Sequence, residues 1–164
     1  MEESNNTINI THPEKVLFPE SNITKGEFVK YYTAIAGRLL PYIKDRPLTV
    51  HCFPHGIAQE GFYRQHAQED LPKWFKTCEL KRKMGGTVKH ILCNDKESLI
   101  YLVNHNTIEF HRWLSTIENP ENPDILIIDI DSPSTRFDLA CKAAKLLKVQ
   151  LEDRKFKPYV MTTG

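Results

Sequence analysis

Asp129 and Asp131 are the two residues whose type and spacing most directly suggest chemistry. They close the apolar run Ile125–Asp131, just before Ser132-Pro133. Residues i and i+2 of a strand point to the same face, so the two carboxylates would be neighbours. Neighbouring carboxylates repel unless a divalent cation such as Mg²⁺ or Mn²⁺ lies between them. The pattern predicts a strand that ends in a metal site; the alternative is that the aspartates only favour the turn that follows.

Histidine and glutamate alternate in a second segment, residues 107–114. A strand there would place Glu109 and His111 on one face, where the imidazole could contact a phosphate. From spacing alone, a partly buried structural histidine is the more frequent explanation. The histidines form no HExxH motif and the cysteines form no CxxC pair. A zinc site is therefore not expected.

Aromatic and basic residues lie side by side at two further places. Phe62 and Tyr63 directly precede Arg64, and nucleic-acid bases stack on such surfaces. Core packing is nevertheless the more frequent role of any single aromatic residue. Lys15 and Lys25 lie at the two ends of a turn rich in Pro, Ser and Asn. They could form a phosphate clamp or be two surface lysines.

Composition limits the class of protein. The chain has 164 residues and a net charge of +1, with 40% hydrophobic and 26% charged residues. These values fit one folded domain without a gross basic excess, so any nucleic-acid surface must be local. No apolar run reaches the roughly 18 residues that cross a membrane, and the acidic, polar start is not a secretory signal. We expect no membrane partner and an intracellular protein with reduced thiols.

Helical and strand patterns mix along the chain without regular βα alternation. Thr24 and Glu27 have capping-box spacing at the start of an apolar helical pattern, and Asp95 can cap a second helix. Residues 1–9 are expected to form a flexible tail and residues 10–164 one domain. The mixture predicts an α+β (mixed α/β) fold. The expected elements are strands over 46–53, 61–66, 87–93, 107–114 and 125–131, and helices over 24–41, 95–105 and 134–153.

Eight segments together resemble one known family, taken in chain order over about Ile10 to Gly164. They are THPEKVLFPE, ITKGEFVKYY, RPLTVHCFPHG, GFYRQH, LPKWFKT, EFHRWLS, NPDILIIDIDSP and KPYVMTTG. The family is the polymerase domain of bacterial and archaeal end-joining DNA ligases (ligase D), in the archaeo-eukaryotic primase superfamily. The resemblance implies a primase-like catalytic sheet with flanking helices and hairpins.

The resemblance also implies roles for individual residues. Asp129 and Asp131 match two of three catalytic carboxylates that bind Mn²⁺ or Mg²⁺. His111 matches a histidine that contacts the triphosphate of the incoming NTP or dNTP, and Thr163 stands where relatives usually have a serine with that role. The remaining implied roles are binding of a DNA 5′-phosphate by Lys15, Lys25 and His12, and stacking on the template strand by Phe62 and Tyr63.

Two departures from the family pattern limit this expectation. The sequence stops at Gly164, inside the nucleotide-binding motif, and the third carboxylate of the family lies further downstream. The domain is therefore expected to be incomplete at its C-terminal end. Relatives often carry arginine or lysine just before Pro54, where this chain reads His51-Cys52-Phe53.

Two functions remain open from the sequence. One is a template-directed nucleotidyltransferase that acts at DNA gaps or broken ends in non-homologous end joining, alongside a ligase domain or end-binding repair proteins. The other is a non-catalytic module that recognises 5′-phosphorylated DNA ends. A phosphohydrolase that uses the two aspartates is a weaker third choice, because no general acid is readable near them. Either DNA-linked function implies a cytoplasmic, nucleoid-associated location.

Overall fold

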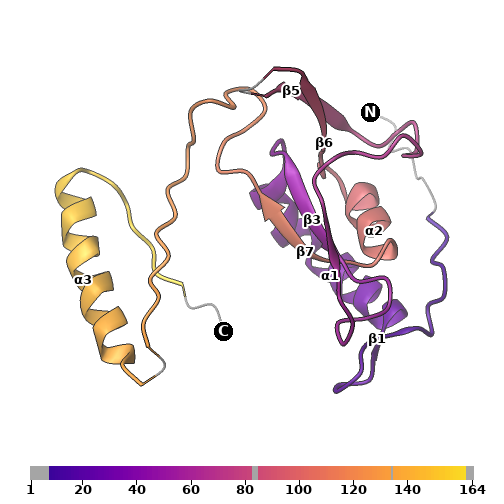
Figure 1. Ribbon diagram of the computed structural model, residues 1–164, viewed down its shortest axis with the longest axis horizontal. Coiled ribbons are helices and arrows are strands. Elements are labelled where there is room, and N and C mark those ends of the chain that lie inside the picture. The colour runs from indigo at the N-terminus through magenta and orange to yellow at the C-terminus, as the bar shows by residue number, and fades with distance from the viewer. Residues whose placement is uncertain (1–7, 83–84, 134, 162–164) are drawn as a thin grey trace. The chain divides into compact units, whose positions relative to one another are not determined.

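The computed structural model describes residues 8–82, 85–133 and 135–161 (Figure 1). It divides the chain into two units, Met1–Ile125 and Leu126–Gly164, and each is described by itself. Of the elements in the described residues, the first unit contains all the strands and two helices, and the second contains one helix. Among the described residues, no helix combines the length and apolar character that a membrane crossing requires. The expected mixed α/β class is confirmed.

The first unit is built on an antiparallel sheet. Its central strand β3 pairs with β4 on one side and with β7 on the other. The hairpin β5–β6 joins the sheet where Leu48 of β3 meets Ile91 of β6. A short separate pair, β1–β2, precedes the first helix. The bounds are β1 Val16–Phe18, β2 Ile23–Thr24, α1 Lys25–Ile43, β3 Leu48–Cys52, β4 Phe62–Arg64, β5 Thr77–Lys81, β6 Thr87–Ile91, α2 Lys96–Asn104 and β7 Thr107–Arg112.

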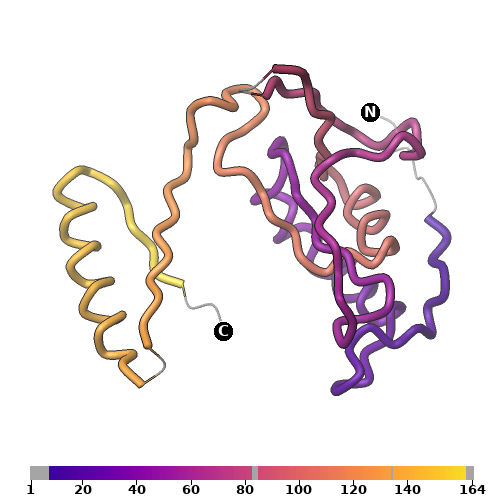
Figure 2. Tube along the Cα trace, viewed as in Figure 1, coloured from indigo at the N-terminus to yellow at the C-terminus, as the bar shows by residue number. Residues whose placement is uncertain are grey.

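Helices α1 and α2 cover one face of this sheet, as the path of the chain in Figure 2 shows. The predicted capping box of α1 is confirmed, because Thr24 and Glu27 each accept a hydrogen bond from the other's backbone N–H. Asp95 caps α2 by accepting from the N–H of Ser98, as predicted. The buried core between helices and sheet contains Leu17, Phe28, Val29, Leu48, Val50, Ile91, Leu99, Leu102 and Val103.

An ion pair between a buried arginine and a half-exposed aspartate ties the end of the first unit to the start of its central strand. The Arg46 guanidinium donates two hydrogen bonds to the Asp124 carboxylate, at 2.7 and 2.6 Å. The Arg46 side chain is only 9% exposed. Asp124 lies in a segment without regular structure, and its N–H donates a hydrogen bond to the carbonyl of Leu114. This pair therefore positions residues 113–124 against the sheet.

The expected strand over residues 125–131 is wrong. The structure assigns no strand there, and Leu126 and Ile127 are 61% and 60% exposed. A strand needs a neighbouring strand to satisfy its N–H and C=O groups, and the second unit offers none among its described residues. The predicted C-terminal helix is present as α3, Phe137–Asp153, and none of its described side chains is buried.

Gly61 directly precedes β4 and lies close to the end of β3. A Cβ atom at this position would lie 2.8 Å from the Cys52 carbonyl oxygen and 2.8 Å from Nε2 of His51. The carbonyl belongs to the sheet backbone and cannot retreat without breaking strand pairing. At Gly37, on helix α1, an added Cβ would meet nothing within 4 Å.

We therefore expect opposite effects from two glycine-to-alanine substitutions. Gly61→Ala should lower the free energy of unfolding by about 1–3 kcal/mol through overpacking. Gly37→Ala should raise it by about 0.5–1 kcal/mol, because alanine is the better helix former. Urea unfolding followed by circular dichroism measures both. Equal stability of the two variants would show that β4 does not approach β3 this closely.

Candidate functional site: a lysine cavity and a histidine–glutamate cluster

A cavity of about 310 Å³ opens beside the N-terminal end of α1. It contains four of the residues singled out in the sequence, namely Lys15, Lys25, His12 and Phe62. The structure thus brings together side chains from the loop before β1, from helix α1 and from strand β4. The full lining is Thr11, His12, Lys15, Lys25, Pro54, Phe62, Arg64, Asn104, His105 and Asn106.

The two lysines are held by short-range backbone contacts. The N–H of Lys25 donates to the carbonyl of Lys15 at 2.7 Å, which places both residues on one wall. The Lys15 ammonium donates to the carbonyl of Pro54. The Lys25 ammonium donates to Oγ1 of Thr11 at 2.9 Å, and Asn104 in turn accepts from the Thr11 N–H. Each ammonium has three N–H donors, so these bonds leave donors available for a ligand.

The electrostatics of this wall favour an anion. Lys25 is only 3% exposed. Burial, and then the positive charge of Lys15, lower the pKa of its ammonium. Two cations held together in a poorly solvated place repel, and an anionic ligand would relieve that repulsion. A phosphate group supplies the charge and the acceptor oxygens that two ammonium groups can share.

Two side chains of β4, Phe62 and Arg64, line one edge of the cavity. The Arg64 guanidinium lies over the Phe62 ring, 5.5 Å from its centroid, and Phe62 is 45% exposed. Tyr63 points to the other face of the strand, as alternation requires. Its ring stacks on His51 with centroids 4.0 Å apart and an interplanar angle of 14°. Exposed rings beside an anion site can stack on nucleic-acid bases.

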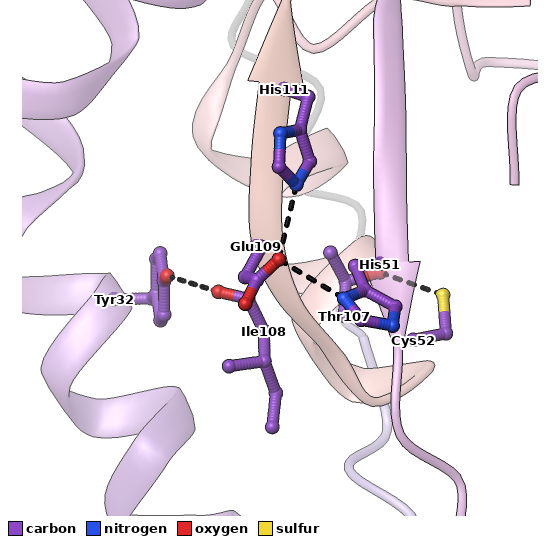
Figure 3. A network of polar contacts seen from close by, with 7 residues as sticks. All are labelled: Tyr32, His51, Cys52, Thr107, Ile108, Glu109 and His111. Atoms are coloured by element: carbon purple, nitrogen blue, oxygen red, sulfur yellow. Dashed lines mark hydrogen bonds and ion pairs between the residues drawn. The ribbon is translucent and has the colours of Figure 1, made fainter. Parts of the chain in front are cut away.

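On the face of the sheet that the helices do not cover, His51, Glu109 and His111 form the histidine–glutamate cluster (Figure 3). Glu109 Oε2 lies 3.0 Å from Nδ1 of His51 and 3.1 Å from Nε2 of His111. Strand pairing explains this geometry, because His51 lies opposite Glu109 on β7 and opposite Tyr63 on β4. A carboxylate only accepts hydrogen bonds, so both facing ring nitrogens carry hydrogen.

The two imidazoles stabilise the charged form of Glu109. Hydrogen bonds from His51 and then from His111 lower the pKa of the Glu109 carboxyl. A lowered folded-state pKa stabilises the fold at pH values above the ordinary carboxyl range. That contribution is lost as the pH falls through the lowered value. Glu109 thus fixes the ring orientation of His111, the residue predicted to meet a triphosphate.

Asp129 and Asp131 lie in the second unit, and both are exposed. Their oxygens are the hard donors that Mg²⁺ and Mn²⁺ take, and Mg²⁺ is commonly held by one or two carboxylates with waters and substrate phosphates. The chemistry of the two side chains suits such an ion, but the strand that was expected to put them on one face is not formed. In the part of the chain that the structure describes, no three His, Cys, Asp or Glu side chains surround one point. Thr163 lies outside the described residues.

Several residues of the lysine cavity and of the histidine–glutamate cluster were not predicted from the sequence. Asn104, His105 and Asn106 line the lysine cavity although they lie some 80 residues beyond Lys25. Their only signal in the sequence is a run of polar residues between a helix and a strand. In the sequence His51 stands out only as a departure from relatives, whereas the structure places it against Glu109.

Comparison with known proteins gives a consistent result. A family model described as the LigD primase-polymerase domain matches residues 24–164. The chain is 30% identical over 158 residues to the bifunctional non-homologous end joining protein LigD of Bacillus subtilis, covering 96% of this chain and 25% of that protein. It is 27% identical over 160 residues to the multifunctional LigD of Mycolicibacterium smegmatis, covering 96% and 21%. The chain thus spans about a quarter or less of these relatives.

A solved structure shares the fold. The polymerase domain from Mycobacterium tuberculosis ligase D, in complex with DNA, superposes with a TM-score of 0.71 at 18% sequence identity. The match covers 90% of this chain and 55% of that domain. The expected primase-like architecture is therefore confirmed at the level of the fold.

Replacing the two histidines of the cluster should release Glu109. In a His51→Phe, His111→Phe double variant, we expect the pKa of the Glu109 carboxyl to rise toward its ordinary value, because both hydrogen bonds are lost. Carboxyl ¹³C shifts recorded against pH measure this. Glu27 is the internal control, since its pKa is lowered by Thr24 and should not change. An unchanged Glu109 titration would refute the cluster.

Proposed function

Because this chain belongs to the LigD primase-polymerase family, we propose that it binds 5′-phosphorylated DNA ends or gaps and forms part of a site for template-directed nucleotidyl transfer. The reaction class is the one that non-homologous end joining requires at broken ends. One observation carries the proposal: Lys15 and Lys25 line a single cavity whose rim is the exposed Phe62. The DNA-bound state of the structurally similar polymerase domain supports it.

The lysine cavity would recognise the end itself. A terminal 5′-phosphate carries more negative charge than an internal phosphodiester, so it gains more from two cations. The buried position of Lys25 strengthens that preference, because its charge is poorly screened by water. Phe62 and Tyr63 would then support the template strand by stacking on its bases.

We assign the incoming nucleotide to the histidine–glutamate cluster and the metal ion to the two aspartates. His111, oriented by Glu109, would donate a hydrogen bond to the triphosphate of an incoming NTP or dNTP. Asp129 and Asp131 would hold Mn²⁺ or Mg²⁺. Such an ion, when bound, lowers the pKa of a primer hydroxyl and neutralises developing phosphate charge. With DNA as the substrate, we also propose a cytoplasmic, nucleoid-associated location.

Binding to a gapped duplex with and without a 5′-phosphate tests end recognition. We expect the phosphate to tighten binding, and Lys15→Gln and Lys25→Gln each to weaken the phosphate-dependent part by about 10-fold. Affinity should fall steeply with salt. Fluorescence anisotropy on labelled DNA is the measurement, with thermal melting to confirm that the variants are folded.

Lys30→Gln is the matched control, because Lys30 is an exposed lysine on the same helix. It should retain full discrimination between the two DNAs. Lys25→Arg tests charge separately from geometry and should keep most of the effect. Equal affinity for DNA with and without the phosphate would refute end recognition by this cavity.

Primer extension in the presence of Mn²⁺ and ribonucleotides tests nucleotidyl transfer. Asp129→Asn and Asp131→Asn should each reduce extension by at least about 100-fold, since each removes a metal ligand. Neither change should alter 5′-phosphate-dependent binding. Asp138→Asn, on helix α3, removes an exposed carboxylate that is paired with Arg136 and should leave extension unchanged.

The same experiment separates the two functions that the sequence left open. Phosphate-dependent binding with no extension by the unaltered chain would favour a non-catalytic end-binding module. Extension that survives both aspartate substitutions would show that these residues are not the metal ligands.

A further inference from the structure

A second cavity lies at the β5–β6 hairpin, and neither the comparisons nor the proposed function assigns it a role. Its volume is about 440 Å³, and it shares no lining residue with the lysine cavity. Volumes of this size accommodate small organic ligands. The lining is Gln65, His66, Leu80, Lys81, Arg82, Val88, His90, Trp113, Pro120 and Glu121.

One wall of this cavity is positively charged. Lys81 and Arg82 both line it, and no carboxylate of a described residue lies within ion-pair distance of either. Both side chains are exposed, and the N–H of Arg82 donates to the Gly86 carbonyl at 2.9 Å. Glu121 is the one carboxylate in the lining, so the positive excess is small. The wall therefore suits a single phosphate better than a triphosphate.

The cavity also contains a buried polar atom without a partner. His90 is 3% exposed, and its Nδ1 has no hydrogen-bond partner among the described residues. Burial, followed by the charges of His66 and Arg82, lowers the pKa of this imidazole. A buried ring nitrogen that lacks a hydrogen bond is unfavourable. A ligand in the cavity could relieve that cost after a rotation of the His90 ring that turns Nδ1 toward it.

Apart from the polar Gln65 and His66, the remaining lining is apolar and includes a large flat ring. Trp113 contacts His90 edge to face, with centroids 5.1 Å apart. Leu80, Val88 and Pro120 complete this surface. Inorganic phosphate would leave it uncovered, whereas a planar base with polar edges would cover it and could reach His90.

The chain connects this cavity directly to the first one. Arg64 lines the lysine cavity, and the next two residues, Gln65 and His66, line the second. His66 is anchored beside β6 by its bridge to His90. A nucleic-acid strand that follows residues 62–66 would therefore pass from one cavity to the other.

We propose that this second cavity binds one nucleotide residue of a DNA strand, with its monophosphate on Lys81 and Arg82 and its base against Trp113. The inference rests on the proposed function in one respect, that the strand belongs to the DNA bound through the lysine cavity. Besides the 5′-phosphate, the protein would thereby hold a second nucleotide of the bound DNA.

Trp113 is a built-in reporter of this binding. The chain has two tryptophans, so Trp74→Phe leaves Trp113 as the only one. In that background, we expect saturable quenching of the fluorescence by deoxynucleoside monophosphates, and binding of inorganic phosphate that is about 10-fold weaker or more. A single-stranded tetranucleotide should bind more tightly than any mononucleotide, because it reaches both cavities.

Substitutions locate the site. Arg82→Gln and Lys81→Gln should each weaken mononucleotide binding by about 5- to 10-fold. His90→Phe keeps a ring against Trp113 but removes the nitrogen, and it should also weaken binding. Lys89→Gln is the matched control, since Lys89 is an exposed lysine of the same hairpin that does not line the cavity. Thermal melting of each variant confirms folding.

Four results would overturn the proposal: no saturable quenching, equal losses in Lys89→Gln and Arg82→Gln, inorganic phosphate binding as well as nucleotides, or mononucleotides binding as tightly as the tetranucleotide. The last would assign the cavity to free nucleotides instead of a DNA strand. Failure here is distinguishable from failure of end recognition. Preference for a 5′-phosphate on gapped DNA depends on Lys15 and Lys25 and is measured separately.

Discussion

Strand β3 pairs with β4 on one side and β7 on the other, and the arrangement of polar groups in the first unit depends on this register. It sets His51 opposite Tyr63 and Glu109 at once. A shift of one residue would turn His51 into the core and Val50 toward solvent. The buried contacts of Val50 with the helices oppose that shift. Hydrophobic packing on the helix-covered face of the sheet thus determines which polar side chains meet on the exposed face.

The first unit groups its cations at two places. Lys25 is buried at the start of α1, whereas the exposed hairpin cations Lys81 and Arg82 line the same cavity as the buried His90. The chain as a whole carries a net charge of only +1. Its affinity for anions must therefore come from local geometry and not from the general field of the protein. This favours recognition of particular phosphates over indiscriminate attraction to DNA.

Features that depend on neighbours in the sequence could be predicted, and those that depend on distant partners could not. The caps at Thr24 and Asp95 are local and were confirmed. The apolar run before Asp129 has high strand propensity, but propensity does not supply a pairing partner, and the strand prediction was wrong. The bond between Thr11 and Asn104 spans 93 positions, and no sequence pattern announces it. The family resemblance located Lys15 and Lys25, while the role of Glu109 needed the structure.

The ion pair between Arg46 and Asp124 has a consequence for the order in which the protein folds. The two residues are 78 positions apart, and Arg46 immediately precedes the Pro47-Leu48 start of the central strand. While the chain is being synthesised, β3 and β4 can pair early, because the loop between them is short. The guanidinium meanwhile stays hydrated and cannot be buried without cost. All the strands that pair with β3 end before residue 113, so the sheet can form before Asp124 is available, and the pairing of Arg46 follows it.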